Sequence, residues 1–348
     1  MDSRERYFNC INRTTPDRLP IRHLALPVIN ERLREYFGIG GTEGDDEALL
    51  GRLGVDFRDI RPTINGDDFG LKKPDERISA CVWNGSLSKG TGKDMPLVGV
   101  EDISEIPTDA FPSADKFDYN VLPGECEKHS QYVRIFGYNE FDFINGISSQ
   151  RGNEQVLEDI ALREKVYLDL LRIRFEFVME HIERALKACD GLIDIVFFGD
   201  DFGSQKGLLI SPDSFRDIFA PYYREGFALA HKYGAKTMLH SCGSCRSLIG
   251  DFIDTGLDIL DVVQTDAAYM VLEELKEEFG RDIVFCGSMS VQELIPYGTR
   301  EQVTAEANRR AELFREGGLI YGPSHVMQLD SILENILQMY GSILKKDL

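Results

Sequence analysis

Eight short apolar runs alternate with amphipathic helical stretches, and this alternation limits the possible folds more than any other feature. Strands separated by helices pair in parallel, with the helices packed outside the sheet. Eight such units in 348 residues favour a closed (β/α)8 TIM barrel, an α/β fold, over an open doubly wound sheet. No Gly-x-Gly-x-x-Gly follows the first run, which argues against a dinucleotide-binding fold. The runs are 21–26, 55–60, 132–136, 193–198, 236–239, 257–263, 283–286 and 319–322, and the main helical stretches are 155–189, 214–233, 269–279, 300–316 and 333–344.

Residues 62–131 interrupt this rhythm. The stretch is rich in Gly, Pro, Asp and Lys, and it contains two short strand-like pieces at 78–83 and 97–100. We expect an inserted hairpin and a long loop that covers one end of the barrel, because loops of this length are often lids or binding elements. A surface decoration or a subunit contact is the alternative. The chain, 1–348, is then a single barrel domain with one insertion.

The charge balance argues against some classes of partner. Thirty-nine basic and 59 acidic residues leave a net charge of −20, which repels nucleic acids and anionic membranes. No apolar run approaches the roughly 20 residues that cross a bilayer, and the polar N-terminus lacks the apolar core of a signal peptide. We therefore expect a cytoplasmic protein. The arginines near the N-terminus are expected to be solvated, with a polyanion-binding site as the alternative: Arg4, Arg6, Arg13, Arg18 and Arg22.

The fifth apolar run leads into His240 and Cys242, which are one residue apart and followed by a glycine. Residues i and i+2 of a strand point to the same face, so an imidazole nitrogen and a thiolate converge at the strand end. His325, after the eighth run, can reach the same barrel mouth. Three such ligands with an open fourth position are typical of a catalytic zinc site. Two alternatives stay open: a metal-free pocket, or a redox pair of Cys242 and Cys245.

Two adjacent acids, Asp200 and Asp201, follow the apolar sequence IDIVFF of the fourth run. In a barrel the chemistry lies at the carboxyl ends of the strands, so such acids are candidates for it. We assign Asp200, the nearer to the strand end, as a fourth metal ligand or a general acid–base. Turn and capping chemistry around Gly203 accounts for one of the two acids.

Several motifs at the ends of the later runs resemble the uroporphyrinogen decarboxylase superfamily, which includes cobalamin-linked, zinc-dependent methyltransferases. The resemblance covers most of the chain from about residue 54 onward. It implies a (β/α)8 barrel with its pocket at the strand carboxyl ends, present as a monomer or a homodimer. The motifs are GDDFGSQ (199–205), ISPDSF (210–215), LHSCGS (239–244), GLDILDVVQ (256–264), LKEEFGRDIVFCGSMSVQELIPYGT (275–299) and GPSHVMQLDSILENI (322–336).

The resemblance is closest to the methyltransferase branch. His240 and Cys242 match the zinc-binding His-x-Cys of that branch, whereas its third ligand, a cysteine, is replaced here by His325. The decarboxylase branch binds the carboxylates of a tetrapyrrole through an arginine-rich N-terminal loop, and the matching stretch here, 24–29, reads LALPVI. Asp59 matches the catalytic aspartate of the decarboxylase branch. Uroporphyrinogen decarboxylation is therefore the alternative activity.

We hypothesise a zinc-dependent methyltransferase. Replacing a thiolate by a neutral nitrogen makes zinc more electrophilic, which suits a small O-methyl compound. The methyl group then passes to cob(I)alamin on a separate corrinoid protein; transfer from methylcobalamin to a bound thiol is the reverse possibility. A non-catalytic barrel that binds a ligand remains a third interpretation. The expected substrate-binding residues are Asp201, Gln205, Gln264, Gln328, Tyr222, Asn145 and Asp59.

Overall fold

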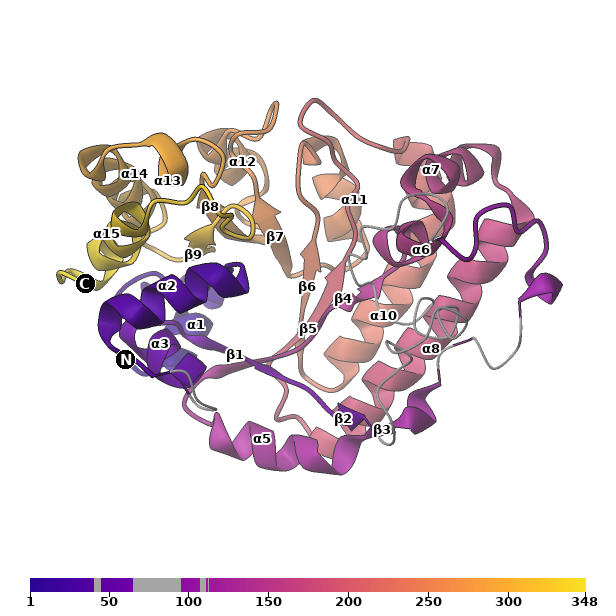
Figure 1. Ribbon diagram of the computed structural model, residues 1–348, viewed down its shortest axis with the longest axis horizontal. Helices are drawn as coiled ribbons and strands as arrows, with labels where there is room; N and C mark the ends of the chain where they lie inside the picture. Colours follow the sequence, from indigo (N-terminus) through magenta and orange to yellow (C-terminus); the bar gives the residue numbers. More distant parts are fainter. Residues whose placement is uncertain (41–44, 65–94, 107–110, 112) are drawn as a thin grey trace.

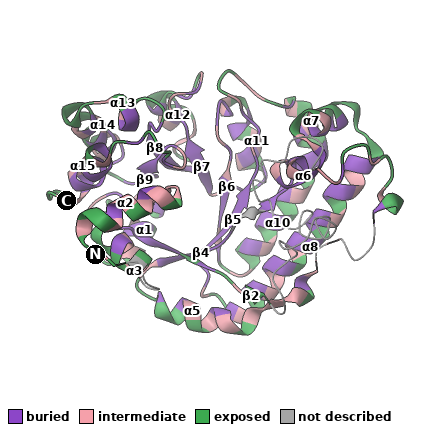
Figure 2. Cartoon of the chain, viewed as in Figure 1, coloured by how far each residue is buried: buried purple, intermediate pink, exposed green. Residues whose placement is uncertain are grey.

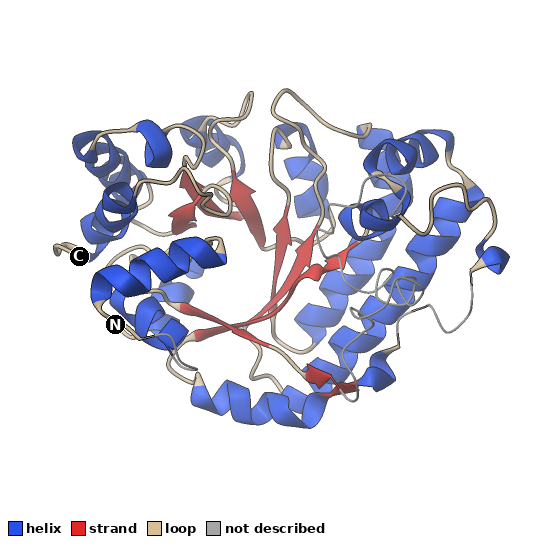
Figure 3. Cartoon of the chain, in the orientation of Figure 1, coloured by secondary structure: helices blue, strands red, loops and turns tan. Residues whose placement is uncertain are grey.

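A parallel sheet curled into a half-barrel forms the centre of the molecule (Figure 1, Figure 3). The computed structural model describes residues 1–40, 45–64, 95–106, 111 and 113–348, and this part of the chain contains seven strands in the sheet. All seven pair in parallel, so seven of the eight predicted strands are confirmed. In spatial order they are β1 (Phe57–Ile60), β4 (Val133–Asp142), β5 (Ile195–Gly199), β6 (Lys236–His240), β7 (Ile259–Val263), β8 (Val284–Met289) and β9 (Leu319–Pro323).

The predicted first strand, 21–26, is reduced to isolated bridges, so a complete eight-stranded barrel is not confirmed. Ile21 bridges to Tyr321 of β9, and Ala25 bridges to Met327. The Ile21 carbonyl also accepts a hydrogen bond from the Asp56 N–H (2.9 Å), next to β1. Proline at 20 and again at 27 leaves this segment little room for a regular ladder, because proline has no N–H to donate. The segment still lies between the two outer strands of the sheet.

Helices cover the outer face of the sheet, with α8 and α10 packed along β4 and β6 (Figure 1). The prediction of one helix over 155–189 is wrong, because Arg163 takes a left-handed conformation (φ 58°) and ends α7. The predicted helix 214–233 begins with a π-helical turn, Phe215–Phe219, before α10. The α-helices are α1 (Ser3–Asn12), α2 (Pro27–Phe37), α3 (Asp45–Arg52), α5 (Leu122–Lys128), α6 (Ile144–Arg151), α7 (Asn153–Leu162), α8 (Lys165–Cys189), α9 (Pro212–Ser214), α10 (Ala220–Lys232), α11 (Ile249–Asp254), α12 (Leu272–Phe279), α13 (Leu294–Tyr297), α14 (Arg300–Leu313) and α15 (Leu333–Leu344).

Two apolar clusters lie on the two faces of the sheet, and the strands are buried throughout most of their length (Figure 2). Successive residues of a strand point to opposite faces, so alternate residues fill the interior. Tyr7 of α1 packs against Phe57, the first residue of β1, with ring centroids 5.8 Å apart, and so covers the amino-terminal end. The opposite end is left for loops. The inner cluster comprises Tyr7, Ile11, Phe57, Val133, Ile135, Ile195, Phe197, Met238, Ile259, Val284, Cys286 and Ile320.

The insertion 62–131 is described only at its ends and near residue 100. Its flanks form a small antiparallel pair, β2 (Thr63–Ile64) with β3 (Phe117–Asp118). The predicted strand at 97–100 is wrong: the segment is a turn whose N–H at Leu97 donates to the Gln150 carbonyl. The predicted strand at 78–83 lies outside the described residues, and the covering role of the insertion stays a prediction. None of the described helices is long and apolar enough to span a membrane.

Three of the five N-terminal arginines, Arg6, Arg18 and Arg22, form ion pairs with buried carboxylates, so the expectation that they are solvated is wrong for these three. Arg6 and Arg18 both donate to the carboxylate of Asp56, at 2.6 and 2.7 Å. Asp56 is fully buried and also accepts the Ile21 N–H at 2.7 Å. One carboxylate therefore joins α1, the Ile21 segment and the start of β1.

Replacing Asp56 with Asn is expected to lower the free energy of unfolding by about 3 kcal/mol, because it leaves Arg18 without its counter-charge and Arg6 with Asp17 alone. Urea unfolding followed by circular dichroism measures this change. The matched control is Asp115→Asn, which breaks an exposed pair with Arg184 and should change stability by less than about 1 kcal/mol. Equal losses in the two variants would contradict the assigned role of Asp56.

Candidate metal centre

Three potential metal ligands converge at the carboxyl end of the sheet. His240 is the last residue of β6, Cys242 follows two residues later, and His325 lies two residues beyond β9. Among the described residues, their ligand atoms form a group in which all lie within 4.8 Å of one another. The two imidazole rings meet edge to face, with centroids 5.7 Å apart. The structure thus brings together the three side chains that the sequence indicated, with two nitrogens and one sulfur facing a common point.

A buried chain of charged groups orients His240. Its Nδ1 lies 2.8 Å from Oδ2 of Asp261, a fully buried residue of β7. The other oxygen of Asp261 accepts a hydrogen bond from Arg22, whose guanidinium stacks 4.6 Å over the ring of Phe197. Because Nδ1 is engaged, Nε2 is the nitrogen available to a metal, an arrangement common in proteins where a carboxylate supports a histidine ligand.

Asp261 and Arg22 were not predicted as part of the site. The available signal was a charged residue at an inward-facing position of an otherwise apolar run: Asp261 is two residues after Ile259, which belongs to the inner cluster. Arg22 follows Ile21, so strand alternation turns its side chain to the interior. Its side chain is only 7% exposed, which corrects the expectation that it is solvated.

Asp201, rather than Asp200, is the carboxylate that lies beside the three ligands. Its Oδ1 is 3.5 Å from Nε2 of His240 and accepts the N–H of Cys242 at 3.2 Å. Its Oδ2 accepts a hydrogen bond from the side-chain amide of Asn145 at 3.0 Å. Asp201 stays partly exposed, with 30% of its side chain accessible. Asn145, expected at the pocket, is thus connected to the site through Asp201.

Asp200 is fully buried and its carboxylate is occupied by other groups. It accepts the N–H groups of Phe143 and Ile144 at the start of α6, at 2.9 and 2.5 Å, and the hydroxyl of Tyr223 at 2.6 Å. Burial, together with the carboxylate of Asp142, raises the pKa of Asp200 to about 8. Asp200, expected to be a fourth ligand or proton handler, does not belong to the converging group and instead caps α6.

The loops after β5 and β6 are in backbone contact, which fixes Cys242. A Cβ atom added to Gly203 would lie 2.7 Å from the Cys242 carbonyl oxygen. Gly243 has φ +76°, and a Cβ there would lie 2.7 Å from the Gly203 backbone. The N–H of Ser244 donates to the carbonyl of Ser204 at 2.7 Å. Only residues without a side chain allow this approach.

A cavity of about 340 Å³ opens beside the converging ligands. Cys242 and His325 line it together with three predicted substrate-binding residues, Gln205, Gln264 and Gln328. The Gln264 side-chain oxygen accepts the N–H of Gly243 at 2.9 Å, so this residue also holds the loop that carries Cys242.

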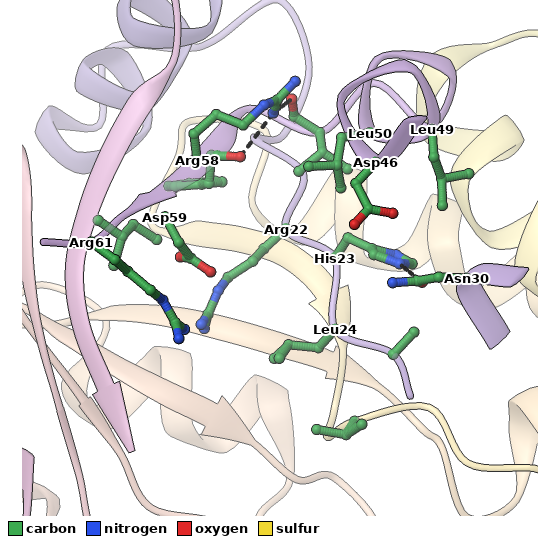
Figure 4. Close-up of a pocket in the computed structure, with 15 residues that line it drawn as sticks. Arg22, His23, Leu24, Asn30, Asp46, Leu49, Leu50, Arg58, Asp59 and Arg61 are labelled. Carbon is green, nitrogen blue, oxygen red and sulfur yellow. Dashed lines mark hydrogen bonds between the residues drawn. The ribbon is translucent and has the colours of Figure 1, made fainter. Parts of the chain in front are cut away.

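The remaining two predicted residues lie elsewhere. Asp59 lines a different cavity of about 320 Å³, beside β1 (Figure 4). Tyr222 packs against Phe175 of α8, with ring centroids 4.6 Å apart, and lines neither this cavity nor the one beside the converging ligands. Its neighbour Tyr223 is the residue that faces the sheet, because consecutive helical side chains point about 100° apart.

The electrostatics of the site favour a proton on His240 when no cation is bound. Burial alone lowers the pKa of His240, but its hydrogen bonds with Asp201 and Asp261 outweigh burial and raise this pKa well above 6.5. Burial opposes ionisation of Asp261, yet the adjacent Arg22 and His240 hold the pKa of this carboxyl below its ordinary value. Burial and the charge on His240 lower the pKa of His325. A divalent cation would therefore displace one proton from His240 and meet a neutral His325.

Comparisons with known proteins agree with the fold and with the motifs. Residues 143–344 match the family model described as uroporphyrinogen decarboxylase (URO-D). The methylated-thiol–coenzyme M methyltransferase of Methanosarcina mazei is 29% identical over 142 residues, which cover 41% of this chain and 35% of that relative. The aligned part thus spans about a third of the relative's length. A solved structure of a methyltransferase from Methanosarcina mazei superimposes with a TM-score of 0.68 at 16% identity, covering 99% of both chains, which shows a shared fold.

In the metal-free protein, the midpoint of the His240 titration is expected well above 6.5, because hydrogen bonds with Asp201 and Asp261 raise the pKa of this imidazole. A pKa raised in the folded state adds stability that is fully present below the unfolded value and is lost as the pH rises through the folded value. The pKa of His240 is measured by following the chemical shift of its ring Cε1–H with pH by NMR. The variant Asp261→Asn should have a lower titration midpoint for His240. The buried ring of His181, whose pKa is lowered to about 3 by burial, is an internal reference that stays neutral. A His240 midpoint at or below 6.5 would contradict the interpretation.

Proposed function

The chain belongs to the uroporphyrinogen decarboxylase (URO-D) family, and from this membership we propose that it is a zinc-dependent methyltransferase. The reaction moves a methyl group between a small methylated compound, or a thiol, and a corrinoid protein. The observation that carries the proposal is the convergence of His240, Cys242 and His325 within 4.8 Å of one another. The name of the Methanosarcina mazei relative, a methylated-thiol–coenzyme M methyltransferase, supports this class of reaction.

The donor set fits zinc. Zinc bonds to imidazole nitrogen at about 2.0–2.1 Å and to thiolate sulfur at about 2.3 Å, so tetrahedral ligand atoms lie roughly 3.5 Å apart. The separations here, within 4.8 Å, need only small side-chain rotations to meet this geometry. The buried Asp261 keeps Nδ1 of His240 engaged and leaves Nε2 for the metal. Zinc bound by one thiolate and two imidazoles would supply a Lewis acid that polarises the methylated oxygen or nitrogen of the substrate.

In this proposal Asp201, and not Asp200, is the acidic residue that acts at the metal. Its partly exposed carboxylate is next to Nε2 of His240, so it can occupy the fourth position. Asn145 holds the other oxygen of Asp201 and thereby sets its direction. Asp200 supports this arrangement from behind by fixing the start of α6, the helix that carries Asn145.

The cavity beside the ligands offers amide groups for the substrate. Gln205 and Gln328 are exposed side chains on its wall, and each amide can both donate and accept hydrogen bonds. A methylated substrate bound there has its heteroatom near Cys242 and His325, which line the same cavity. Transfer of a methyl group to a bound thiol uses the same residues in the opposite direction.

Zinc-loaded protein is expected to transfer methyl groups from methoxy compounds to free cob(I)alamin. The change in the visible spectrum of the corrinoid measures this transfer. Cys242→Ser and His325→Ala should each lose most of the bound zinc and of this activity, because each removes one of three protein ligands. Asp261→Asn should weaken zinc binding by about 10–100-fold, since it frees the His240 ring.

The matched control is Cys245→Ser, which changes a fully buried thiol whose sulfur donates to the Ser241 carbonyl at 3.7 Å. This variant should retain both zinc and activity. Loss of activity in Cys245→Ser with zinc retained would favour a redox pair instead. Clean turnover of uroporphyrinogen by the protein, without any methyl transfer, would favour decarboxylation and overturn the proposal.

A further inference from the structure

We propose that the cavity beside β1 binds the acidic end of the substrate, a carboxylate that carries a hydrogen-bond donor, either ammonium or hydroxyl, on the neighbouring carbon. The cavity has a volume of about 320 Å³ and is lined by Arg22, Asp59 and Arg61 among other residues (Figure 4). That this ligand is the methylated substrate rests on the proposed function.

Strand alternation explains why Asp59 and Arg61 face the cavity. Phe57 belongs to the inner cluster, so Asp59, two residues later, points to the same face at the carboxyl end of β1. Arg61 follows just beyond the strand on that same face. Both side chains are exposed, although β1 is otherwise buried.

Arg58 points the other way and is committed to structural contacts. Its guanidinium donates to both oxygens of Glu47, each at 2.6 Å, and lies 3.7 Å from the ring centroid of Tyr132. Arg58 therefore commits its guanidinium to Glu47 and Tyr132, whereas Arg22 and Arg61 are the other arginines that line the cavity.

Arg22 gives this cavity a buried charge. Its residue exposure is only 6%, and it is held in place by the ion pair with Asp261. In Figure 4 the side chains of Arg22, Asp59 and Arg61 turn toward the same part of the cavity. A guanidinium group has five donors in a planar fork, so Arg22 can bond Asp261 and still present donors to a ligand.

The mixture of charges defines the ligand class. Two planar guanidinium groups match the geometry of a carboxylate. The carboxylate of Asp59 repels a simple anion but accepts a hydrogen bond from an ammonium or a hydroxyl group. An acid with such a donor beside it satisfies all three side chains at once, whereas a molecule bearing many carboxylates does not.

One residue belongs to the walls of both cavities, so the two cavities are neighbours. Val326 lines the cavity beside β1 and also the cavity of the candidate metal centre. It is adjacent in sequence to His325. A ligand with its acid group at Arg22 and Arg61 and its methylated heteroatom at Cys242 therefore lies along the mouth of the barrel.

Binding of O-methyltyrosine to the metal-free protein, measured by calorimetry, tests this inference without requiring activity. O-methyltyrosine has the acid, the ammonium and a methyl ether at the far end. Its amide lacks the carboxylate, and 3-(4-methoxyphenyl)propionate lacks the donor. We expect both analogues to bind at least 10-fold more weakly than O-methyltyrosine. Arg61→Gln and Asp59→Asn should each weaken the binding of O-methyltyrosine to a similar extent. Arg61→Lys should bind it more tightly than Arg61→Gln does.

The matched control is Arg163→Gln, which removes an exposed arginine paired with Asp217 at the outer surface and should bind like the unaltered protein. Equal binding of the acid and its amide, full affinity in Arg61→Gln, or no binding of any acid in the series would overturn the inference. Absence of zinc or of methyl transfer would instead count against the proposed function, and binding that still depends on Arg61 and Asp59 would then remain as an acid site.

Discussion

A buried chain of three charged side chains, Arg22, Asp261 and His240, is the arrangement on which the rest of the site depends. Asp261 is fully buried and Arg22 almost so, above an interior filled by apolar side chains such as Phe197 and Met238. Charges in such a place are stable only when paired and hydrogen-bonded. Asp261 meets this condition by bonding Arg22 with one oxygen and His240 with the other. The imidazole orientation is therefore set before any ligand arrives.

This chain also connects distant parts of the sequence. Arg22 comes from the segment between the outer strands, His240 from the end of β6 and Asp261 from β7. Loops after β5 and β6 add a second constraint, since Gly203 and Gly243 bring their backbones into contact next to Cys242. The same β5 loop separates two adjacent carboxylates by environment. Burial raises the pKa of Asp200, whereas the hydrogen bond with His240 outweighs burial and lowers the pKa of Asp201.

Periodicity in the sequence was enough to predict the seven strands of the parallel sheet and the His-x-Cys pair, because local alternation alone determines both. It was not enough where long-range contacts decide. The segment at 21–26 has a strand-like composition, but its pairing depends on Tyr321 and Met327, far along the chain. The break at Arg163 depends on a left-handed residue that the helical pattern does not indicate.

The errors at the site have the same origin. Distance from the strand end favoured Asp200 over Asp201, but the N–H groups of α6 that capture Asp200 come from another part of the chain. The helical pattern does not indicate which of two neighbouring tyrosines faces the sheet, nor that Tyr222 packs against Phe175 of α8. The sequence alone does not show that Arg22 is buried, because its partner, Asp261, is 239 residues away.

X-ray absorption at the zinc edge of the zinc-loaded protein measures which atoms bind the metal. We expect one sulfur at about 2.3 Å and two imidazole nitrogens at about 2.0–2.1 Å, with a lighter atom completing the shell. Loss of the sulfur signal in Cys242→Ser should accompany loss of the metal. A shell of oxygen and nitrogen alone, or two or more sulfurs, would contradict binding by His240, Cys242 and His325.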